Sequence, residues 1–207
     1  MLLPRIYPIT DTQISGLSHA DQVRLLAEGG ATFVQLREKN LPALDFYNEA
    51  KSVSASGLTL IINDRVDVAM AVNAAGVHLG QDDVPPEAAR KLLGDEAIIG
   101  YSTHNLAQAR AAAKLPVDYI AIGPIFRTVT KANPDPEVGL DGLRAVRDAI
   151  GDIPLVAIGG ITPANAADVI NAGADSVALI SALLSAGPEA IADRFRALLE
   201  NLPGRQT

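Results

Sequence analysis

The sequence predicts an α/β protein that folds as a single (β/α)8 TIM barrel. Short apolar runs alternate with longer amphipathic stretches along 207 residues, a length that suits one such barrel. Hydrophobic residues make up 48% of the chain and aromatic residues only 4%, so the core must be built from Val, Ile, Leu and Ala. These residues are typical of parallel strands covered by helices. No linker or change of composition divides the chain, so we expect one domain over residues 1–207.

The predicted strands are short, rich in β-branched residues and nearly continuous in their apolar character. Strands buried on both faces have this pattern. A closed barrel accounts for such a series better than an open doubly wound sheet. The predicted strands are Ile6–Ile9, Phe33–Leu36, Thr59–Ile62, Val77–Leu79, Ile98–Tyr101, Tyr119–Ile122, Leu155–Ile158 and Val177–Ile180.

The predicted helices are Ala- and Leu-rich segments with helical spacing between the strands. Gly follows several of them, as at Gly29 and Gly173, which is a helix-stop signal. The longest irregular stretch, Gly123–Gly139, is too polar and Pro-rich for a helix and is expected to be a functional loop. The predicted helices are Asp21–Glu28, Ala43–Ser54, Pro86–Leu93, Leu106–Lys114, Gly142–Ile150, Ala164–Ala172 and Glu189–Glu200.

Charge and composition exclude several classes of function. The net charge is -7 and no run is rich in Lys or Arg, which argues against a nucleic-acid partner. The absence of cysteine excludes disulfides, thiol nucleophiles, iron–sulfur clusters and Cys-type zinc sites. We find neither a signal peptide nor a long apolar run, so we expect a cytoplasmic protein that does not enter a membrane. The sequence leaves open whether the chain forms a homo-oligomer.

Polar residues recur where the predicted strands end. Active sites of such barrels lie at the C-terminal ends of the strands. One charged residue there is often only solvated, but the recurrence at strand after strand favours a functional site. The residues concerned lie in Gln35–Lys39, Asn63–Arg65, Gly80–Asp83, Ser102–His104, Thr128–Lys131 and Gly159–Ile161, and at Ser181.

Two acidic residues at these ends form a candidate metal site. Asp64 and Asp83 follow neighbouring strands, so their carboxylates can converge. Two carboxylates, together with substrate phosphate oxygens and waters, are a usual environment of Mg²⁺. The alternative is that each carboxylate makes a loop hydrogen bond or a salt bridge, with Arg65 as the obvious partner.

Phosphate groups have two candidate sites. Arg37, Lys39 and Lys131 are the candidate phosphate or pyrophosphate ligands, against the alternative of ordinary surface cations. Gly159-Gly160 and Ser181 mark the ends of the seventh and eighth strands, where such barrels often bind phosphate through backbone N–H groups. The alternative is that the two glycines only make a tight turn.

The three histidines have different expected places. His19 is expected at the surface, His78 packed inside a strand, and His104 at a strand end, where it is a candidate acid–base group.

Seven motifs in order resemble those of the thiamine phosphate synthase family, from Tyr7 to the last predicted helix. Each motif alone is weak, whereas seven at successive strand ends are highly specific. They are QLREK at Gln35–Lys39, IND at Ile62–Asp64, GVHLGQDD at Gly76–Asp83, GYSTH at Gly100–His104, GPIFRTVTK at Gly123–Lys131, AIGGIT at Ala157–Thr162 and GADSVALIS at Gly173–Ser181.

The resemblance implies a transferase that joins 4-amino-2-methyl-5-(diphosphooxymethyl)pyrimidine to 4-methyl-5-(2-phosphooxyethyl)thiazole, giving thiamine phosphate and pyrophosphate. In this family Mg²⁺ assists the loss of pyrophosphate, and the thiazole nitrogen captures a pyrimidine-methyl carbocation. Such chemistry needs cations around the leaving group and no general base.

The resemblance also implies roles for individual residues. By motif, Asp64 and Asp83 would bind Mg²⁺, and Lys131, Arg37, Lys39 and Ser102 would be the catalytic residues. Gln35, Arg37, Lys39, Asn63, Ser102 and Lys131 would contact the pyrimidine diphosphate, and Thr128, Thr130, Gly160, Ile180 and Ser181 would hold the thiazole phosphate.

Two features depart from the family pattern. Family members often have Pro where Arg127 stands, and the loop continues into an unusual NPDPE stretch at Asn133–Glu137. Both features concern how this loop closes rather than the chemistry of the site.

Two other functions remain open at this point. The related thiazole tautomerase has the same fold and uses a histidine, for which His104 is the candidate, but it appears without the Asp pair and the Thr-x-Thr-Lys loop. A non-catalytic phosphate-binding regulatory barrel is the other, although a sensor would not need a metal site.

Overall fold

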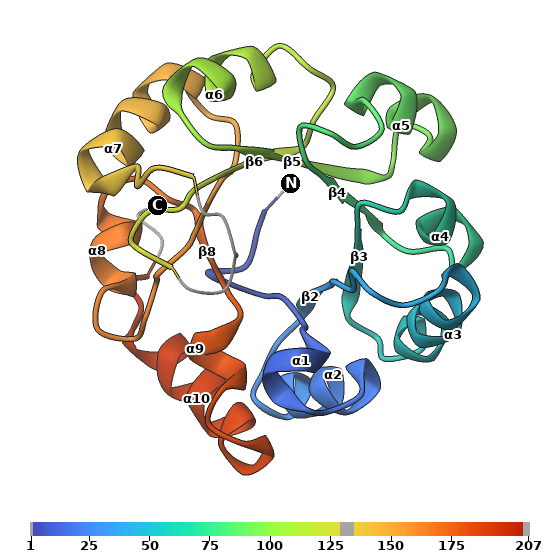
Figure 1. The fold of residues 1–207 in the computed structure, drawn as a ribbon. Coiled ribbons are helices and arrows are strands. Elements are labelled where there is room, and N and C mark those ends of the chain that lie inside the picture. The colour runs from blue at the N-terminus through green and yellow to red at the C-terminus, as the bar shows by residue number, and fades with distance from the viewer. Residues whose placement is uncertain (1, 129–134, 205–207) are drawn as a thin grey trace.

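Eight parallel strands form a barrel, seen along its axis in Figure 1. The computed structural model describes residues 2–128 and 135–204. The sheet order is β1-β8-β7-β6-β5-β4-β3-β2, and a parallel bridge between Ile9 and Gln35 joins its first and last strands. The strands are β1 (Ile6–Pro8), β2 (Phe33–Leu36), β3 (Thr59–Asn63), β4 (Gly76–Leu79), β5 (Ile98–Thr103), β6 (Tyr119–Ile122), β7 (Leu155–Ile158) and β8 (Ser176–Leu179).

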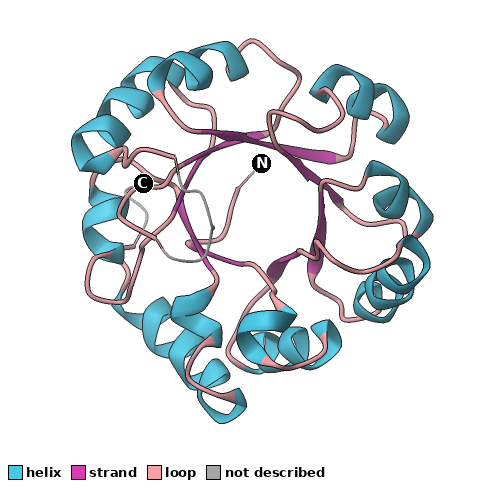
Figure 2. Ribbon diagram, viewed as in Figure 1, coloured by secondary structure: helices cyan, strands magenta, loops and turns pink. Residues whose placement is uncertain are grey.

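Helices surround the barrel as an outer ring (Figure 2). No helix among residues 2–128 and 135–204 is long and apolar enough to cross a membrane. The helices are α1 (Thr12–Ser15), α2 (His19–Glu28), α3 (Ala43–Ser54), α4 (Val66–Ala71), α5 (Pro86–Leu93), α6 (Leu106–Ala112), α7 (Gly139–Ile150), α8 (Ala166–Asn171), α9 (Ser181–Leu184) and α10 (Pro188–Asn201).

The apolar residues divide into two clusters. The larger fills the space between strands and helices and is dominated by Val, Ile, Leu and Ala, as the composition predicts. The smaller lies inside the barrel and contains aromatic residues, with the Tyr7 and Phe33 rings edge to face at 4.7 Å. The tyrosines on β1 and β6 bring hydroxyl groups into this interior, where they meet the buried side chains of Gln35 and His78.

The predicted alternation of strands and helices is confirmed, and the strand bounds shift by only one or two residues. Sequence periodicity missed three helices, α1, α4 and α9. These have four to six residues, too few to establish a helical repeat. Local capping identifies α1 instead, because the Asp11 side chain accepts hydrogen bonds from the N–H groups of Gln13 and Ile14.

The expectation for His19 is wrong. Its side chain is fully buried at the start of α2, where Nδ1 lies 2.8 Å from Thr10 Oγ1. Burial lowers the pKa of His19, so the imidazole is neutral at pH 7. The prediction failed because a histidine next to a Ser N-cap has the pattern of a solvated helix start, whereas Thr10 and Glu38 enclose this one.

Candidate active site

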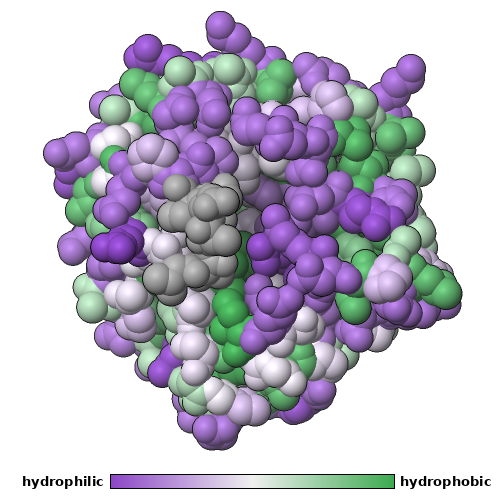
Figure 3. Space-filling view, viewed as in Figure 1, coloured by the Kyte–Doolittle hydropathy of each residue, from purple (hydrophilic) through white to green (hydrophobic). Residues whose placement is uncertain are grey.

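The polar residues predicted to form the site follow the C-terminal ends of the strands, at one end of the barrel. Hydrophilic side chains gather around a hollow near the centre of the face seen in Figure 3. Thr130 and Lys131 lie outside the described residues. The others are Gln35 on β2, Arg37 and Lys39 after it, Asn63 and Asp64 at the end of β3, Asp83 after β4, Ser102 on β5, Thr128 after β6, Gly160 after β7, and Ile180 and Ser181 after β8.

The carboxyl groups of Asp64 and Asp83 converge, as their strand positions predict. The pKa of Asp64 is raised to about 6, first by partial burial and then by the hydrogen bond and charge of Asp83. Lys39 and the side chain of Asn63 act in the opposite direction. Asp64 therefore takes up a proton more readily than an isolated aspartate, because burial and the neighbouring carboxyl group of Asp83 both oppose its ionisation.

The backbone holds Asp64 in a strained conformation. Its φ is 62°, in the left-handed region that side chains other than Asn, Asp and Gly seldom adopt. Its N–H donates to the His78 carbonyl oxygen at 2.8 Å, which ties the turn after β3 to β4. From this turn the Asp64 carboxyl group lies within hydrogen-bond reach of Asp83.

Arg65 does not neutralise this pair. Its guanidinium binds Asp67 through two hydrogen bonds of 2.8 and 2.6 Å, so the salt bridge that the sequence offered as an alternative is made to another residue. Asp83 is positioned by the backbone, because its Oδ2 accepts the Gly80 N–H at 2.7 Å. The carboxylates keep lone pairs for a cation.

The acidic pair fits a hard divalent cation. Among the described residues no group of three or more His, Cys, Asp or Glu side chains could hold a metal ion. Two carboxylates supply only part of a Mg²⁺ shell, which suits an ion that keeps several waters and takes further oxygens from a phosphorylated substrate.

The loop between β2 and α3 is held by Glu38. One carboxylate oxygen accepts the N–H groups of Lys39 and Asn40, both at 2.8 Å, and the other accepts the Thr12 hydroxyl at 3.0 Å. Burial alone would raise the pKa of Glu38, but these hydrogen bonds outweigh it and the pKa is lowered. His19 Nε2 lies 3.5 Å from the same carboxylate. Glu38 therefore fixes the backbone of this loop and ties it to Thr12.

Arg37 is also held in place. Its Nη1 donates to Asp11 Oδ2 at 2.9 Å, and both side chains are largely shielded from solvent. A guanidinium has five N–H donors, so most remain for a phosphate. Sequence reasoning missed Asp11 and His19, and it counted Glu38 among the strand-end residues without a role. The N-cap pattern at Asp11 was the available signal.

The β7 and β8 ends approach the β6 loop closely. Gly159 and Gly160 have φ of 98° and 65°, as in the predicted tight turn. A Cβ on Gly160 would lie 2.5 Å from the Arg127 carbonyl oxygen, so only glycine lets the two loops meet. Ile180 precedes α9, which begins at Ser181. Backbone N–H groups at these turns are the candidate ligands of a second phosphate.

His104 is half-buried beside the β6 loop. Its Nδ1 lies 2.8 Å from the Gly123 carbonyl oxygen and 3.4 Å from Asp135 Oδ2. The carbonyl oxygen can only accept, so Nδ1 carries a hydrogen. His104 thus connects β5 to the NPDPE stretch.

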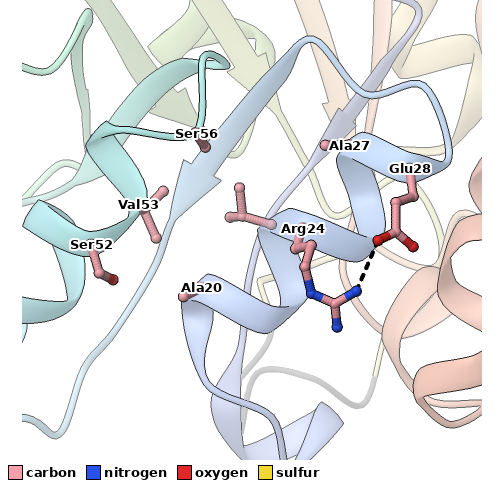
Figure 4. A pocket seen from close by; sticks show the side chains of 8 residues that line it. Ala20, Arg24, Ala27, Glu28, Ser52, Val53 and Ser56 are labelled. Carbon is pink, nitrogen blue, oxygen red and sulfur yellow. Dashed lines mark hydrogen bonds and ion pairs between the residues drawn. The ribbon is translucent and has the colours of Figure 1, made fainter.

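A groove on the outside of the barrel is separate from this site. It lies between α2 and α3, has a volume of about 300 Å³ and is bordered on the α2 side by the Arg24–Glu28 hydrogen bond of 2.8 Å (Figure 4). Its lining is mostly small residues on helix faces, away from the strand ends. It is no part of the barrel mouth.

Comparison with known proteins points to one family. The family model described as thiamine monophosphate synthase matches residues 6–183. The chain is 47% identical over 201 residues to the thiamine-phosphate synthase of Chloroflexus aurantiacus, covering 94% of this chain and 92% of that one. It is 46% identical over 209 residues to that of Koribacter versatilis, covering 96% and 97%. The structure of thiamine phosphate pyrophosphorylase from Pyrococcus furiosus superposes with a TM-score of 0.85 at 36% identity, covering 97% of both chains.

Proposed function

The chain belongs to the thiamine monophosphate synthase family of transferases, and we propose that the residues at its barrel mouth carry out the synthase reaction. The enzyme joins the pyrimidine diphosphate to the thiazole phosphate and releases pyrophosphate. The carbon–oxygen bond to the diphosphate breaks, its electron pair leaves with the diphosphate, and the thiazole nitrogen supplies the pair for the new carbon–nitrogen bond.

The convergence of Asp64 and Asp83 is the observation that carries this proposal. A tautomerase or a phosphate sensor has no use for two adjacent carboxyl groups, of which burial and the neighbouring Asp83 raise the pKa of Asp64. Mg²⁺ held by this pair would supply positive charge to the departing diphosphate oxygens. The relatives above share the synthase name rather than either alternative.

The basic residues do the rest of the electrostatic work. Arg37 and Lys39 follow β2, and Lys131 is expected in the loop after β6, so that fixed positive charge surrounds the leaving group. Cations that are already in position need no reorganisation as the carbon–oxygen bond breaks. Electrostatic stabilisation of the leaving group is therefore the largest catalytic contribution. No group need act as a base, because the attacking nitrogen already has a lone pair.

The second substrate is assigned to the turns after β6, β7 and β8. Thr128 and Thr130 would donate hydroxyl hydrogens to its phosphate, and Gly160, Ile180 and Ser181 would offer backbone N–H groups. This assignment places the thiazole opposite the acidic pair and leaves the pyrimidine between them. His104 has no step in the coupling and serves to hold the β6 loop.

The test is a coupling assay with both phosphorylated substrates, with Mg²⁺ or with a chelator, detecting thiamine phosphate. We expect turnover only with Mg²⁺, and we expect Asp83→Asn to abolish it. Asp82→Asn is the matched control, because Asp82 is the neighbouring exposed acid. Normal turnover in Asp83→Asn would overturn the metal assignment. Tautomerase activity alone, lost in a His104→Ala variant, would overturn the proposed function.

A further inference from the structure

A chain of hydrogen bonds crosses the inside of the barrel from one wall of the site to the other. Gln35 Nε2 donates to the Tyr7 hydroxyl at 3.0 Å, and the Tyr7 and Tyr119 hydroxyls are 2.7 Å apart. Tyr119 lies 2.9 Å from His78 Nδ1, and His78 Nε2 lies 2.8 Å from Ser102 Oγ. Gln35 on β2 and Ser102 on β5 are both assigned to the pyrimidine substrate, so the chain connects two substrate contacts.

The fold makes room for this chain at one position. A Cβ on Gly100 would overlap the Tyr119 phenol and crowd His78 Nδ1. Gly100 is paired with both His78 and Tyr119 in the strand register, so the three residues lie side by side on β4, β5 and β6. The ring planes of His78 and Tyr119 stack at 21°. A larger residue at position 100 would break the bond between them.

The members of the chain have few hydrogens to share. Burial raises the pKa of both Tyr7 and Tyr119, so each phenol keeps its hydrogen. The buried His78 ring lies between two hydroxyl groups, Tyr119 at Nδ1 and Ser102 at Nε2, and no carboxylate among the described residues is hydrogen-bonded to it, so the ring is neutral and carries one N–H. Each phenol and the imidazole therefore donates one hydrogen bond, and the direction of one bond fixes the direction of the next.

Followed from Gln35, the directions are determined. The Gln35 amide donates to Tyr7, whose own hydrogen must then go to Tyr119. Tyr119 donates to His78 Nδ1, which leaves the His78 hydrogen on Nε2, pointing at Ser102 Oγ. The Ser102 hydroxyl then keeps its hydrogen for the barrel mouth. At the other end Gln35 Oε1 has no hydrogen-bond partner among the described residues and is left as an acceptor.

Charges at the two ends favour this direction over the reverse. Reversal would turn the Gln35 amide group toward the mouth and leave Ser102 as an acceptor. Arg37 and Lys39 lie in the loop that follows β2, just beyond Gln35, and their positive charges favour the amide oxygen of Gln35 at the mouth. Asp83 acts electrostatically on His78 at the other end, where a negative charge favours an outward hydrogen on Ser102.

We propose that Tyr7, Tyr119 and His78 are positioning residues that determine substrate specificity. They do so by making Gln35 a hydrogen-bond acceptor and Ser102 a hydrogen-bond donor toward the substrate. An acceptor on Gln35 and a donor on Ser102 match a ring with an amino group beside a ring nitrogen. They oppose the oxo analogue, whose oxygen accepts and whose ring N–H donates. The inference rests on the proposed function for the identity of the ring, whereas the direction of the chain does not.

The first arm of the test measures the His78 tautomer by nitrogen-15 NMR of the wild-type chain without substrate. We expect a neutral ring with its hydrogen on Nε2 and an unprotonated Nδ1. A hydrogen on Nδ1, or a mixture of both tautomers, would overturn the proposal. This measurement remains valid even if the protein couples no substrates. It therefore separates the failure of this inference from the failure of the proposed function.

The second arm compares the pyrimidine diphosphate with its oxo analogue in Tyr119→Phe. Without the Tyr119 hydroxyl, Tyr7 would donate to Gln35 instead, and the Gln35 amide group would turn toward the ring. We expect kcat/KM for the amino substrate to fall and the preference for it over the analogue to fall by about tenfold or more.

Controls keep the second arm decisive. Tyr47→Phe changes the same atom on α3, away from the chain, and should leave the preference unchanged. Tyr7→Phe serves if Tyr119→Phe does not fold, because it interrupts the same chain beside Gln35. A folded variant that retains the wild-type preference would overturn the proposal, as would an equal loss of preference in Tyr47→Phe.

Discussion

The two sides of the barrel mouth differ in how far their polar groups are satisfied. On the basic side, the loop after β2, Glu38 accepts three hydrogen bonds and Arg37 is paired with Asp11. The acidic side consists of Asp64 and Asp83. There the pKa of Asp64 is raised, which favours its neutral form, and the backbone of Asp64 has a strained left-handed conformation. The basic side is thus organised by its own contacts, whereas the acidic side is the one that the proposed cation would complete.

Under the proposed function, this difference would let one site bind both a cation and a diphosphate. Arg37 is paired with Asp11, and Glu38 holds the loop, so the Arg37 guanidinium does not neutralise the acidic pair. A cation bound between Asp64 and Asp83 would relieve their repulsion, which would add to the affinity for Mg²⁺. The hydrogen-bonded chain from Gln35 to Ser102 then links the two sides through the barrel core.

The largest effect is expected on the acidic side. Asp83→Asn removes one carboxylate of the pair and should lower kcat/KM by about a thousandfold or more, because the leaving diphosphate loses most of its neutralising charge. Coupling kinetics at saturating Mg²⁺ measure this. Asp82→Asn should stay near the wild-type rate, and the circular dichroism spectrum should be unchanged in both.

The next effect concerns His78, which belongs to the series of hydrogen bonds between the two sides, and the pH dependence of protein stability. The pKa of His78 is lowered by burial from 6.5 to about 4, so its stabilisation is fully present above pH 6.5 and is lost as the pH falls toward 4. That shift corresponds to about 3 kcal/mol in the free energy of unfolding. Urea unfolding between pH 7.5 and 4.5 should show a steeper decline in wild type than in His78→Gln. Parallel pH profiles would contradict a buried neutral His78.

A smaller effect is expected on the basic side. Glu38→Gln replaces the acceptor of Thr12 by an amide group and weakens the support of Arg37 and Lys39. We expect kcat/KM to fall by about tenfold, chiefly through KM for the pyrimidine diphosphate, because one loop loses its fixed geometry. Steady-state kinetics test this against Glu49→Gln on α3. An unchanged KM would mean that the loop needs no such support.

The smallest effect is expected on the stability of the folded chain, through the raised pKa of Asp64 on the acidic side. The raised pKa of Asp64 makes its protonated form the stabilising one, so this contribution is present below about pH 4 and is lost as the pH rises through 6. Asp64→Asn should therefore stabilise the metal-free chain at pH 8 by about 1 kcal/mol, after allowance for solvent screening. Thermal unfolding at pH 8 and pH 4 measures it, and no gain at pH 8 would argue against repulsion within the pair.

The sequence predicts the barrel and the location of its site because both depend on repeated local patterns. Apolar runs determine the strands, and polar residues at their ends identify the mouth. Convergence of Asp64 and Asp83 follows from neighbouring parallel strands alone. These features need no knowledge of side-chain directions.

The interactions behind the site could not be predicted in the same way. Tyr7 and Tyr119 are 112 positions apart, and no periodicity relates them. His19 has the sequence pattern of a solvated helix start, yet Thr10 and Glu38 enclose it after the barrel closes. The sequence did not determine the partner of Arg65 either, because Asp64 and Asp67 are both within reach along the chain and the structure pairs Arg65 with Asp67. Such contacts depend on three-dimensional closure rather than on local pattern.

The central claim is that the acidic pair and the basic loop hold one cation and one diphosphate between them. Anomalous diffraction from crystals grown with Mn²⁺ and pyrophosphate tests it most directly. We predict a single metal peak bridging the carboxylates of Asp64 and Asp83, with the diphosphate between that ion and Arg37. A metal peak elsewhere, or a diphosphate bound away from both sides, would contradict the account.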